Sequence, residues 1–493
     1  MSERHVQLFA SLAAGKVLAV ALGLATTTVL VGWLLGPAGL GQWTLLAAAG
    51  TLLHTALINW THPSTVRYGR EEWVRTHSLN RTLGARAPLL AVGAAIALLL
   101  VLVDPAQWLQ RVFGADRSAV WMVLLFTLAA WAAAEAQATF QAADCISWQA
   151  VLAPAIGGLS ALALLVLMWT GRRSLAAAVV AFTIFPIAGW GGAWVLALAR
   201  SGTRVARLRF ADFGRNVRYA VPLLPTFVVG YLSDWGDHLL LRYFSTVEAV
   251  GLFGISYQVL LTILAGNSVL TTLLLPRLIA QEVAAPGSVR TYVDAEVPTL
   301  YALWMIATVW VVAAAPAAVR LFTASTFARS VNLLLILMIV VPSSVVTSLY
   351  TIPFNVQERT WRLFFYLVVM TAANIAISLT LVPTYGAIGA AVGTAVAYAV
   401  AQALYVIDQH SALAVPAMRV WTLWAVGLAL GVGQLAAGPD VAARAIWAVL
   451  ATAVLIAIVR VAGCVDDRLV ERLFAGRLSP VADIINRTLV TRA

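Results

Sequence analysis

Four ionisable side chains occupy one short apolar stretch, residues 218–243. Asp234, His238 and Arg242 recur at every fourth residue, so in a helix they share one face, and Asp237 lies close beside it. A guanidinium or imidazolium group can bind an anion, and a carboxylate can bind and release a coupling ion. Alternatively, each carboxylate neutralises the basic group four or five residues further on and fixes a helix interface. The two interpretations are compatible, and both exclude a helix that is surrounded by lipid on every side.

Three further ionisable residues lie inside apolar stretches, where a charged side chain costs at least about 2.5–3.5 kcal/mol to insert. Lys16 lies about seven residues, or ~10 Å, into the first stretch, and His54 lies at a comparable depth on the second. Together they could hold an anion, or Lys16 could extend to the lipid headgroups and His54 could be a hydrogen-bonded packing residue. Glu135 lies deep in a later stretch, on a polar edge with Gln137 and Gln141, and is a candidate ion-coupling acid.

The composition shows what kind of element carries these side chains. The chain has 493 residues, of which 61% are hydrophobic and only 11% are charged. Soluble domains carry about 25% charged residues. The mean hydropathy is +0.89 over the whole length, so the apolar character is not confined to one anchor. These values exclude a soluble enzyme, a disordered regulator and a single-span receptor, and they predict an all-α polytopic membrane protein.

Apolar runs of about 18 to 25 residues predict about fourteen transmembrane helices. They cover residues 9–34, 39–61, 86–103, 118–142, 149–170, 174–199, 218–243, 249–275, 297–319, 329–353, 361–382, 386–407, 418–437 and 441–463. The first run is too long for a signal peptide and lacks an A-x-A cleavage site, so we expect it to be a retained span. The outward loops are all short, which leaves no room for an external catalytic domain.

The distribution of arginine tests this topology independently. With the N-terminus in the cytoplasm, the inward segments hold 23 of the 32 basic residues and the outward segments hold 8. This asymmetry predicts an even number of spans with both termini in the cytoplasm. It also explains the net charge of +11 without a nucleic acid partner. Two cysteines are too few for a disulfide framework, and their positions indicate no metal site.

The two halves of the chain share two landmarks. Gly39 and Gly251, each in a tight turn between spans, are 212 residues apart, and Pro63 and Pro276, each near the end of a second span, are 213 apart. The common offset predicts a duplicated six-span unit, as in many transporters. The alternative is that glycine turns and interfacial prolines coincide by chance.

The same segments carry a family resemblance. Leu-Gly-Pro-Ala-Gly-Leu-Gly-Gln-Trp (35–43) is similar to the glycine-rich turn of bacterial polysaccharide flippases of the O-antigen type, and Thr-Val-Arg-Tyr-Gly (65–69) resembles the end of their second span. Residues 231–244 with Val-Gly-Leu-Phe (250–253) resemble their seventh span and its turn. Val-Pro-Thr-Tyr-Gly-Ala-Ile-Gly-Ala-Ala (382–391) resembles the loop before their twelfth span. Each motif is weak alone, and their common order carries the resemblance.

The resemblance implies the multidrug/oligosaccharidyl-lipid/polysaccharide exporter superfamily. Its members pack two six-helix lobes around a central cavity and work by alternating access. The polysaccharide branch moves undecaprenyl-diphosphate-linked glycans across the bacterial inner membrane. The implied organisation is an N-terminal lobe (1–200), a basic cytoplasmic linker (201–217), a C-terminal lobe (218–408), two extra transmembrane helices (418–463) and a cytoplasmic tail (464–493). In that tail, apolar residues at helical spacing predict a surface helix, with Leu469, Val470, Leu473 and Phe474 on its apolar face.

The expected function is therefore that of a lipid-linked glycan flippase without enzymatic activity or cofactor, with membrane lipids and glycan polymerases or glycosyltransferases as partners. The expected substrate-binding residues are Lys16, His54, His238 and Arg242, and the expected ion-coupling residues are Glu135, Asp234 and Asp237. One departure is that the family often has arginine where this chain has His238. A multidrug antiporter of the same superfamily is the alternative, and a membrane glycosyltransferase or polysaccharide ligase is a third hypothesis that the short outward loops disfavour.

Overall fold

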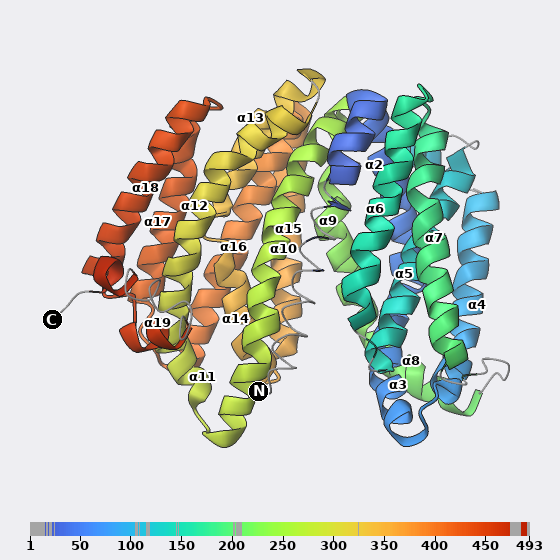
Figure 1. Ribbon diagram of the computed structural model, residues 1–493, viewed down its shortest axis with the longest axis horizontal. Helices are drawn as coiled ribbons and strands as arrows, with labels where there is room; N and C mark the ends of the chain where they lie inside the picture. Colours follow the sequence, from blue (N-terminus) through green and yellow to red (C-terminus); the bar gives the residue numbers. More distant parts are fainter. Residues whose placement is uncertain are drawn as a thin grey trace. The chain divides into compact units, whose positions relative to one another are not determined.

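A computed structural model describes most of the chain. The described residues are 15, 18, 22–23, 25–103, 107, 109–114, 119–143, 145, 147–200, 203, 210–323, 325–473 and 485–490. Every regular element within them is a helix, which confirms the all-α prediction (Figure 1). The chain divides into two compact units, Met1–Gly254 and Ile255–Ala493. Lys16, the expected cation of the first span, lies outside the described residues.

The first unit contains the helices that carry most of the expected site residues. They are α2 (Val31–Leu57), α3 (His62–Thr76), α4 (Asn80–Val103), α5 (Val120–Ala142), α6 (Ser147–Trp169), α7 (Leu175–Arg200), α8 (Phe210–Ala220), α9 (Leu224–Phe244) and the first turns of α10 (Val247–Ala284). Short helical segments join them: η1 (Ala25–Leu30), η2 (Asn59–Thr61), η3 (Leu109–Phe113) and η5 (Val221–Leu223). Helix α2 packs against α5 and α9, and α5 packs against α3 and α7.

The second unit contains the rest of α10 and the C-terminal helices. They are α11 (Ser288–Thr291), α12 (Val297–Phe322), α13 (Ala328–Leu337), α14 (Val345–Val356), α15 (Thr360–Tyr385), α16 (Ala387–Leu413), α17 (Met418–Ala437), α18 (Val441–Val461) and α19 (Asp467–Leu473). The short segments η6 (Tyr292–Glu296), η7 (Ser325–Phe327) and η8 (Met338–Val340) precede α12, α13 and α14. In α19, Leu469 and Val470 are buried, as the predicted apolar face requires, whereas the side chain of Leu473 and the whole of Phe474 lie outside the described residues.

Ten of the described helices are long and apolar enough to cross a membrane. The segments Ser325–Val340 and Val345–Val356, which are bent by 44° at a short break, would form an eleventh if they are one span. These coincide with eleven of the fourteen predicted spans. Two others correspond to α2 and α9, and α9 carries three charged side chains that reduce its hydropathy. The remaining span, 9–34, lies partly outside the described residues, so the count of fourteen stays a prediction.

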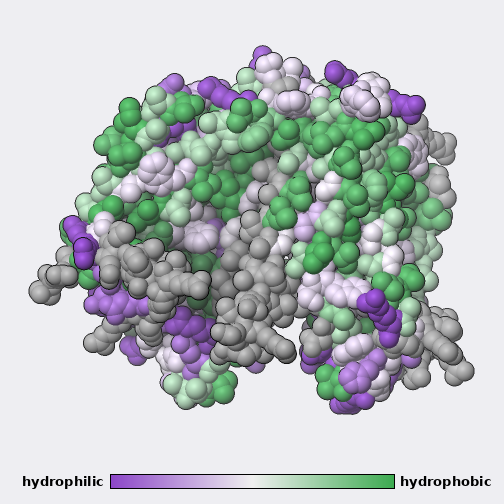
Figure 2. All heavy atoms as spheres, in the orientation of Figure 1, coloured by the Kyte–Doolittle hydropathy of each residue, from purple (hydrophilic) through white to green (hydrophobic). Residues whose placement is uncertain are grey.

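The surface has the hydropathy expected of membrane helices. On the face seen in Figure 2, apolar side chains cover the lengths of the helices, and hydrophilic side chains gather near their ends. Exposed residues such as Leu159, Ile184 and Leu450 lie in the middle of candidate spans. In water such a surface would aggregate, whereas in a bilayer these side chains meet lipid tails.

One predicted boundary is wrong. The basic segment 62–85 was expected to be a loop before a span at 86, but α3 already begins at His62 and α4 begins at Asn80. Helix α4 starts early because the Glu72 carboxylate accepts hydrogen bonds from the backbone N–H groups of Arg81 and Thr82, both at 2.8 Å. These bonds satisfy donors that have no partner within the helix. Arg86, expected at the first residue of the span 86–103, therefore lies more than one turn inside α4.

The two glycine motifs of the predicted repeat contact each other. A Cβ atom on Gly41 of α2 would collide with the carbonyl oxygen of Val247, and one on Gly251 of α10 would collide with the carbonyl oxygen of Pro37. The contact is reciprocal, because each helix contributes one glycine and one carbonyl group. Gly36 has φ of 68°, a conformation that favours glycine, and interrupts α2 just before Pro37. Glycine at these positions thus permits two helices to approach backbone to backbone.

In the second unit, α17 supports the break between η8 and α14. A Cβ atom on Gly431 would collide with the carbonyl oxygen of Ile339, so the backbones lie very close there. The break itself is hydrogen-bonded, because Ser343 donates to Gln402 Oε1 at 2.8 Å and Asn267 donates to Ser344 Oγ at 2.9 Å. Ser344 Oγ in turn donates to the carbonyl oxygen of Val341 at 2.8 Å, so a side chain supplies a donor for a backbone carbonyl group in the break.

Helix α18 is fixed to α12 by a buried cation. Arg444 is 1% exposed, and its guanidinium donates to the carbonyl oxygens of Ala313 and Gly438, both at 2.9 Å, and to Gln434 Oε1 at 2.8 Å. It also donates to the carbonyl oxygen of Val312. All these acceptors are neutral. Gln434 and Gly438 lie at the end of α17, whereas Val312 and Ala313 lie in the interior of α12. The arginine therefore ties the two C-terminal helices to the rest of the second unit.

Candidate functional site

A buried charged cluster lies at the junction of α2, α3, α4 and α5. His54 is near the end of α2, His62 begins α3, Arg86 lies in α4 and Glu135 lies in α5. All four side chains are buried, and Arg86 and Glu135 are 0% and 1% exposed. The cluster includes two expected site residues, His54 and Glu135, and two that were not expected.

The centre of the cluster is an ion pair between Arg86 and Glu135. Arg86 Nη1 lies 2.7 Å from Glu135 Oε2. The same guanidinium donates through Nε to Thr61 Oγ1 at 2.7 Å and through Nη1 to Thr65 Oγ1 at 2.9 Å. Trp131 Nε1, one turn before the glutamate, donates to Glu135 Oε1 at 2.9 Å. Both ions therefore have hydrogen bonds besides their mutual contact, which a buried pair requires.

The two histidines extend the cluster. His62 Nε2 lies 3.3 Å from Glu135 Oε1, and His62 Nδ1 lies 3.0 Å from the carbonyl oxygen of Asn59. Both neighbours are acceptors, so only a doubly protonated His62 ring can donate to both. The His54 ring lies 5.7 Å from the His62 ring, centroid to centroid. A proton arriving at His62 would thus lie directly beside the Glu135 carboxylate, which makes the cluster a place where protonation and the ion pair can interact.

The ion pair lies within the membrane-spanning part of the helices. Arg86 is six residues after the start of α4, and Glu135 is seven residues before the end of α5. At 1.5 Å per residue both lie about 10 Å from the helix ends that are predicted to be cytoplasmic. Both side chains are buried, so water does not solvate the charges and each ion depends on the other.

The four ionisable residues of α9 have different surroundings. Asp237 and His238 are buried, whereas Asp234 is exposed, although the spacing places it on the same face as His238. The His238 ring lies 5.4 Å from the Trp235 ring and 5.2 Å from the Phe253 ring. The Arg242 guanidinium lies against Gly114, where a Cβ atom would collide with it. Arg242 Nε is buried and has no hydrogen-bond partner among the described residues.

An open pocket of about 540 Å³ lies beside the buried cluster. Its walls come from α3, α5, α8 and α9 and from the turn before α3. Gln137 and Gln141, the predicted polar edge of α5, line it, whereas Glu135 faces the buried cluster instead. His62 belongs to both, because its ring lines the pocket and contacts Glu135. The imidazole therefore separates the pocket from the ion pair.

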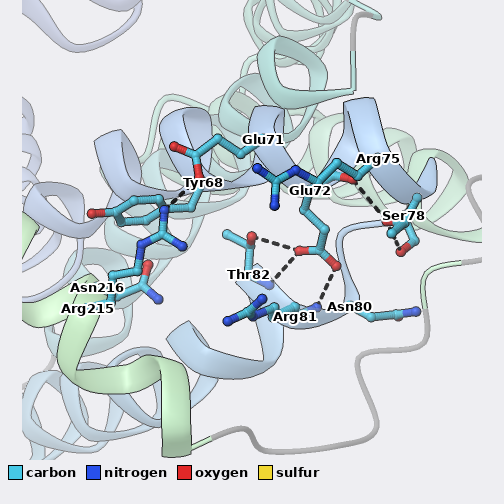
Figure 3. A pocket seen from close by; sticks show the side chains of 11 residues that line it. Tyr68, Glu71, Glu72, Arg75, Ser78, Asn80, Arg81, Thr82, Arg215 and Asn216 are labelled. Carbon is cyan, nitrogen blue, oxygen red and sulfur yellow. Dashed lines mark hydrogen bonds and ion pairs between the residues drawn. The ribbon is translucent and has the colours of Figure 1, made fainter.

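A second pocket, of about 300 Å³, is lined by residues of α3, of α8 and of the start of α4 (Figure 3). Arg215 of α8 bonds to Glu71 of α3 at 2.6 Å, and its guanidinium carbon lies 3.9 Å from the centroid of the Tyr68 ring. The hydrogen bond to Glu71 raises the pKa of Arg215, so the guanidinium stays charged. The contacts join α8 to α3, although an ion pair this exposed contributes little stability.

Sequence reasoning missed Arg86, His62 and Arg444. Arg86 was placed at the boundary of the predicted span 86–103 and counted with the inward segment, because hydropathy locates the start of a span where charges end. This rule cannot recognise a charge that is neutralised inside the span. The helix-initiating residue types at Ser78 and Asn80 were a usable signal for the earlier start of α4. Arg444 was counted with the outward segments for the same reason, although it lies inside both the predicted span 441–463 and α18.

No protein-family model matches the sequence, and no curated protein sequence matches it. In structure, the chain is similar to the lipid II flippase MurJ in an inward closed conformation, with a TM-score of 0.68 and 12% identity over 89% of this chain and 96% of that one. It is also similar to an inward-facing MATE family multidrug resistance transporter of the MOP superfamily, with a TM-score of 0.57 and 12% identity over 83% of this chain and 98% of that one. A third similar structure is the eukaryotic MATE transporter AtDTX14, with a TM-score of 0.53 and 14% identity over 82% of this chain and 96% of that one. The chain thus has the all-helical polytopic fold of MurJ and the MATE transporters.

Proposed function

We propose that the chain is a flippase that moves an undecaprenyl-diphosphate-linked oligosaccharide or polysaccharide repeat unit across the bacterial inner membrane by alternating access. The likeness to the lipid II flippase carries this proposal. It covers 89% of the chain at a TM-score of 0.68, against 83% and 0.57 for the MATE family transporter of the MOP superfamily. The sequence motifs of polysaccharide flippases favour the same branch. In this proposal both termini face the cytoplasm, and a glycan polymerase or glycosyltransferases act beside the flippase.

The substrate would present two phosphates, which require cations. We assign this role to Arg242 and Lys16, with His54 and His238 as groups that bind phosphate when they are protonated. Arg242 is the strongest of these, because its guanidinium is half-buried and one of its donors has no described partner. A guanidinium with a free donor in a membrane helix is suited to an anionic ligand.

We assign ion coupling to Glu135, Asp234 and Asp237. Glu135 supports the proposal most directly, because Arg86 and His62 compete for the same carboxylate. If a proton reaches His62, the imidazolium attracts Glu135 and weakens its pairing with Arg86. The cluster joins α2, α3, α4 and α5, so a change in this pairing acts on the packing of four helices.

The multidrug antiporter remains the second candidate because two of the similar structures are MATE transporters. A site for cationic drugs needs acids that face the ligand. The 540 Å³ pocket has no carboxylate among its lining residues, since Glu135 is directed away from it. This observation favours the glycan flippase.

Export of surface polysaccharide in a deletion strain tests the proposal. Cells complemented with Arg242→Ala should accumulate lipid-linked precursor and lose surface glycan, because the diphosphate loses a counter-charge. Arg172→Ala is a matched control, since it removes one arginine from an exposed turn between α6 and α7. Normal export by Arg242→Ala would overturn the cationic role, and normal export by the deletion strain itself would overturn the flippase.

A further inference from the structure

The pocket beside the buried cluster is lined by three amide side chains. Asn59 precedes α3, and Gln137 and Gln141 lie one turn apart on α5. No hydrogen bond from these three amide groups to another described side chain or backbone group is present. Each amide offers two donors and one acceptor oxygen, so together they present a set of neutral hydrogen-bonding groups to whatever enters the pocket.

Two aromatic rings complete the lining. Tyr219 at the end of α8 and Phe227 near the start of α9 both line the pocket. Neither ring is exposed, and neither is fully buried. A sugar has polar edges and apolar faces. A lining that contains both amides, which can bind hydroxyl groups, and aromatic rings, which can contact the apolar face of a pyranose, therefore suits a sugar.

The charges of the pocket exclude other ligand classes. Its only cation among the described lining residues is Arg67, and that guanidinium already lies 4.9 Å from the centroid of the Tyr219 ring and 5.7 Å from that of Tyr68. A phosphate would need more positive charge, and a cationic drug or a metal ion would need a carboxylate that the lining lacks. His62, which also lines the pocket, donates through Nδ1 to the Asn59 carbonyl oxygen, and its buried Nε2 atom lies 3.3 Å from Glu135.

We propose that this pocket, lined by Asn59, Gln137 and Gln141, binds neutral sugar residues of the transported glycan, separately from the cations that bind the diphosphate. The inference rests on the proposed flippase function and names the part of the substrate that the first unit recognises. Its volume, about 540 Å³, suits a group of one to three sugar residues. The pocket thereby confers selectivity for the glycan, whereas Arg242 and Lys16 bind any prenyl diphosphate.

Binding of two synthetic probes to the purified full-length protein tests the inference. One probe is a short-chain prenyl diphosphate that carries a disaccharide, and the other is the same prenyl diphosphate without sugar. The variants are Asn59→Leu, Gln137→Met and Gln141→Met, which keep volume and remove hydrogen bonding. Gln281→Met is the control, because Gln281 is in α10 of the second unit and does not line the pocket.

The wild type should bind the disaccharide probe more tightly than the sugar-free probe. Each pocket variant should reduce that preference about 2- to 10-fold, the range of one hydrogen bond, with sugar-free binding and thermal stability unchanged. An unchanged preference in all three variants would overturn the sugar pocket while leaving the flippase intact. If the wild type binds neither probe, the flippase proposal itself fails, and equal binding of both probes by the wild type contradicts only the sugar pocket.

Discussion

The buried ion pair between Arg86 and Glu135 gives a quantitative prediction. Replacing Arg86 by Met leaves the buried Glu135, about 10 Å from the end of α5, with only neutral donors and His62. Replacing Glu135 by Met leaves the guanidinium with two threonine hydroxyl groups. Removing one partner of a buried pair costs about 3–5 kcal/mol. Replacing both partners removes the two charges together, so the free energy of unfolding of the double variant should lie within about 2 kcal/mol of the wild-type value.

The measurement is equilibrium unfolding of the four proteins by SDS titration in mixed micelles. The double-mutant cycle should give a coupling free energy of about 3 kcal/mol or more, in the direction that stabilises the pair. Thr65→Val is a control, because it removes one hydrogen bond to Arg86 and should cost only about 1 kcal/mol. Additive single variants, with a coupling near zero, would refute the reasoning, since they would mean that each charge is solvated without the other.

Three further predictions concern stability in detergent. Gly431→Ala should lower the free energy of unfolding by about 1–3 kcal/mol, because a methyl group there meets the Ile339 carbonyl oxygen, whereas Gly433→Ala, whose nearest contact would be 3.8 Å away, should be neutral or slightly stabilising. Arg444→Met should cost about 2–4 kcal/mol, because it leaves buried carbonyl groups without donors; a loss below 1 kcal/mol would contradict that account. Asp440→Ala should lower the free energy of unfolding by about 1 kcal/mol, because the Asp440 carboxylate caps α18 by accepting a hydrogen bond from the backbone N–H of Ala443 at 2.8 Å. Asp440→Asn keeps an acceptor oxygen and should retain most of this stability.

The fold was largely predictable because membrane spans are defined by composition. Long apolar runs such as 174–199 and 418–437 agree with α7 and α17 to within one residue at each end, since lipid allows only a continuous helix there. The bend at 338–344 was not predictable from hydropathy. It depends on Ser343 and Asn267 meeting partners on other helices, and hydropathy averages over such side chains.

The candidate site was predicted only in part. Glu135 and His54 were identified as membrane-embedded ionisable groups, and both lie in the buried cluster. Arg86 and His62 were missed, because their residue types also occur in basic loops and helix starts. Only the packing of α4 against α3 and α5 brings the Arg86 charge to Glu135. Pairing across helices is a property of tertiary structure, which the spacing along one helix cannot reveal.

Transport by the purified protein in liposomes tests the central claim most directly. Vesicles would contain a fluorescent disaccharide linked to undecaprenyl diphosphate, and a membrane-impermeant quencher would report the fraction in the outer leaflet over time. We expect the wild type to move the lipid between leaflets, Arg242→Ala to slow this movement at least about tenfold, and Arg172→Ala to match the wild type. Protein-containing vesicles that move the lipid no faster than empty ones, while expelling a cationic dye, would contradict the flippase and favour the multidrug antiporter.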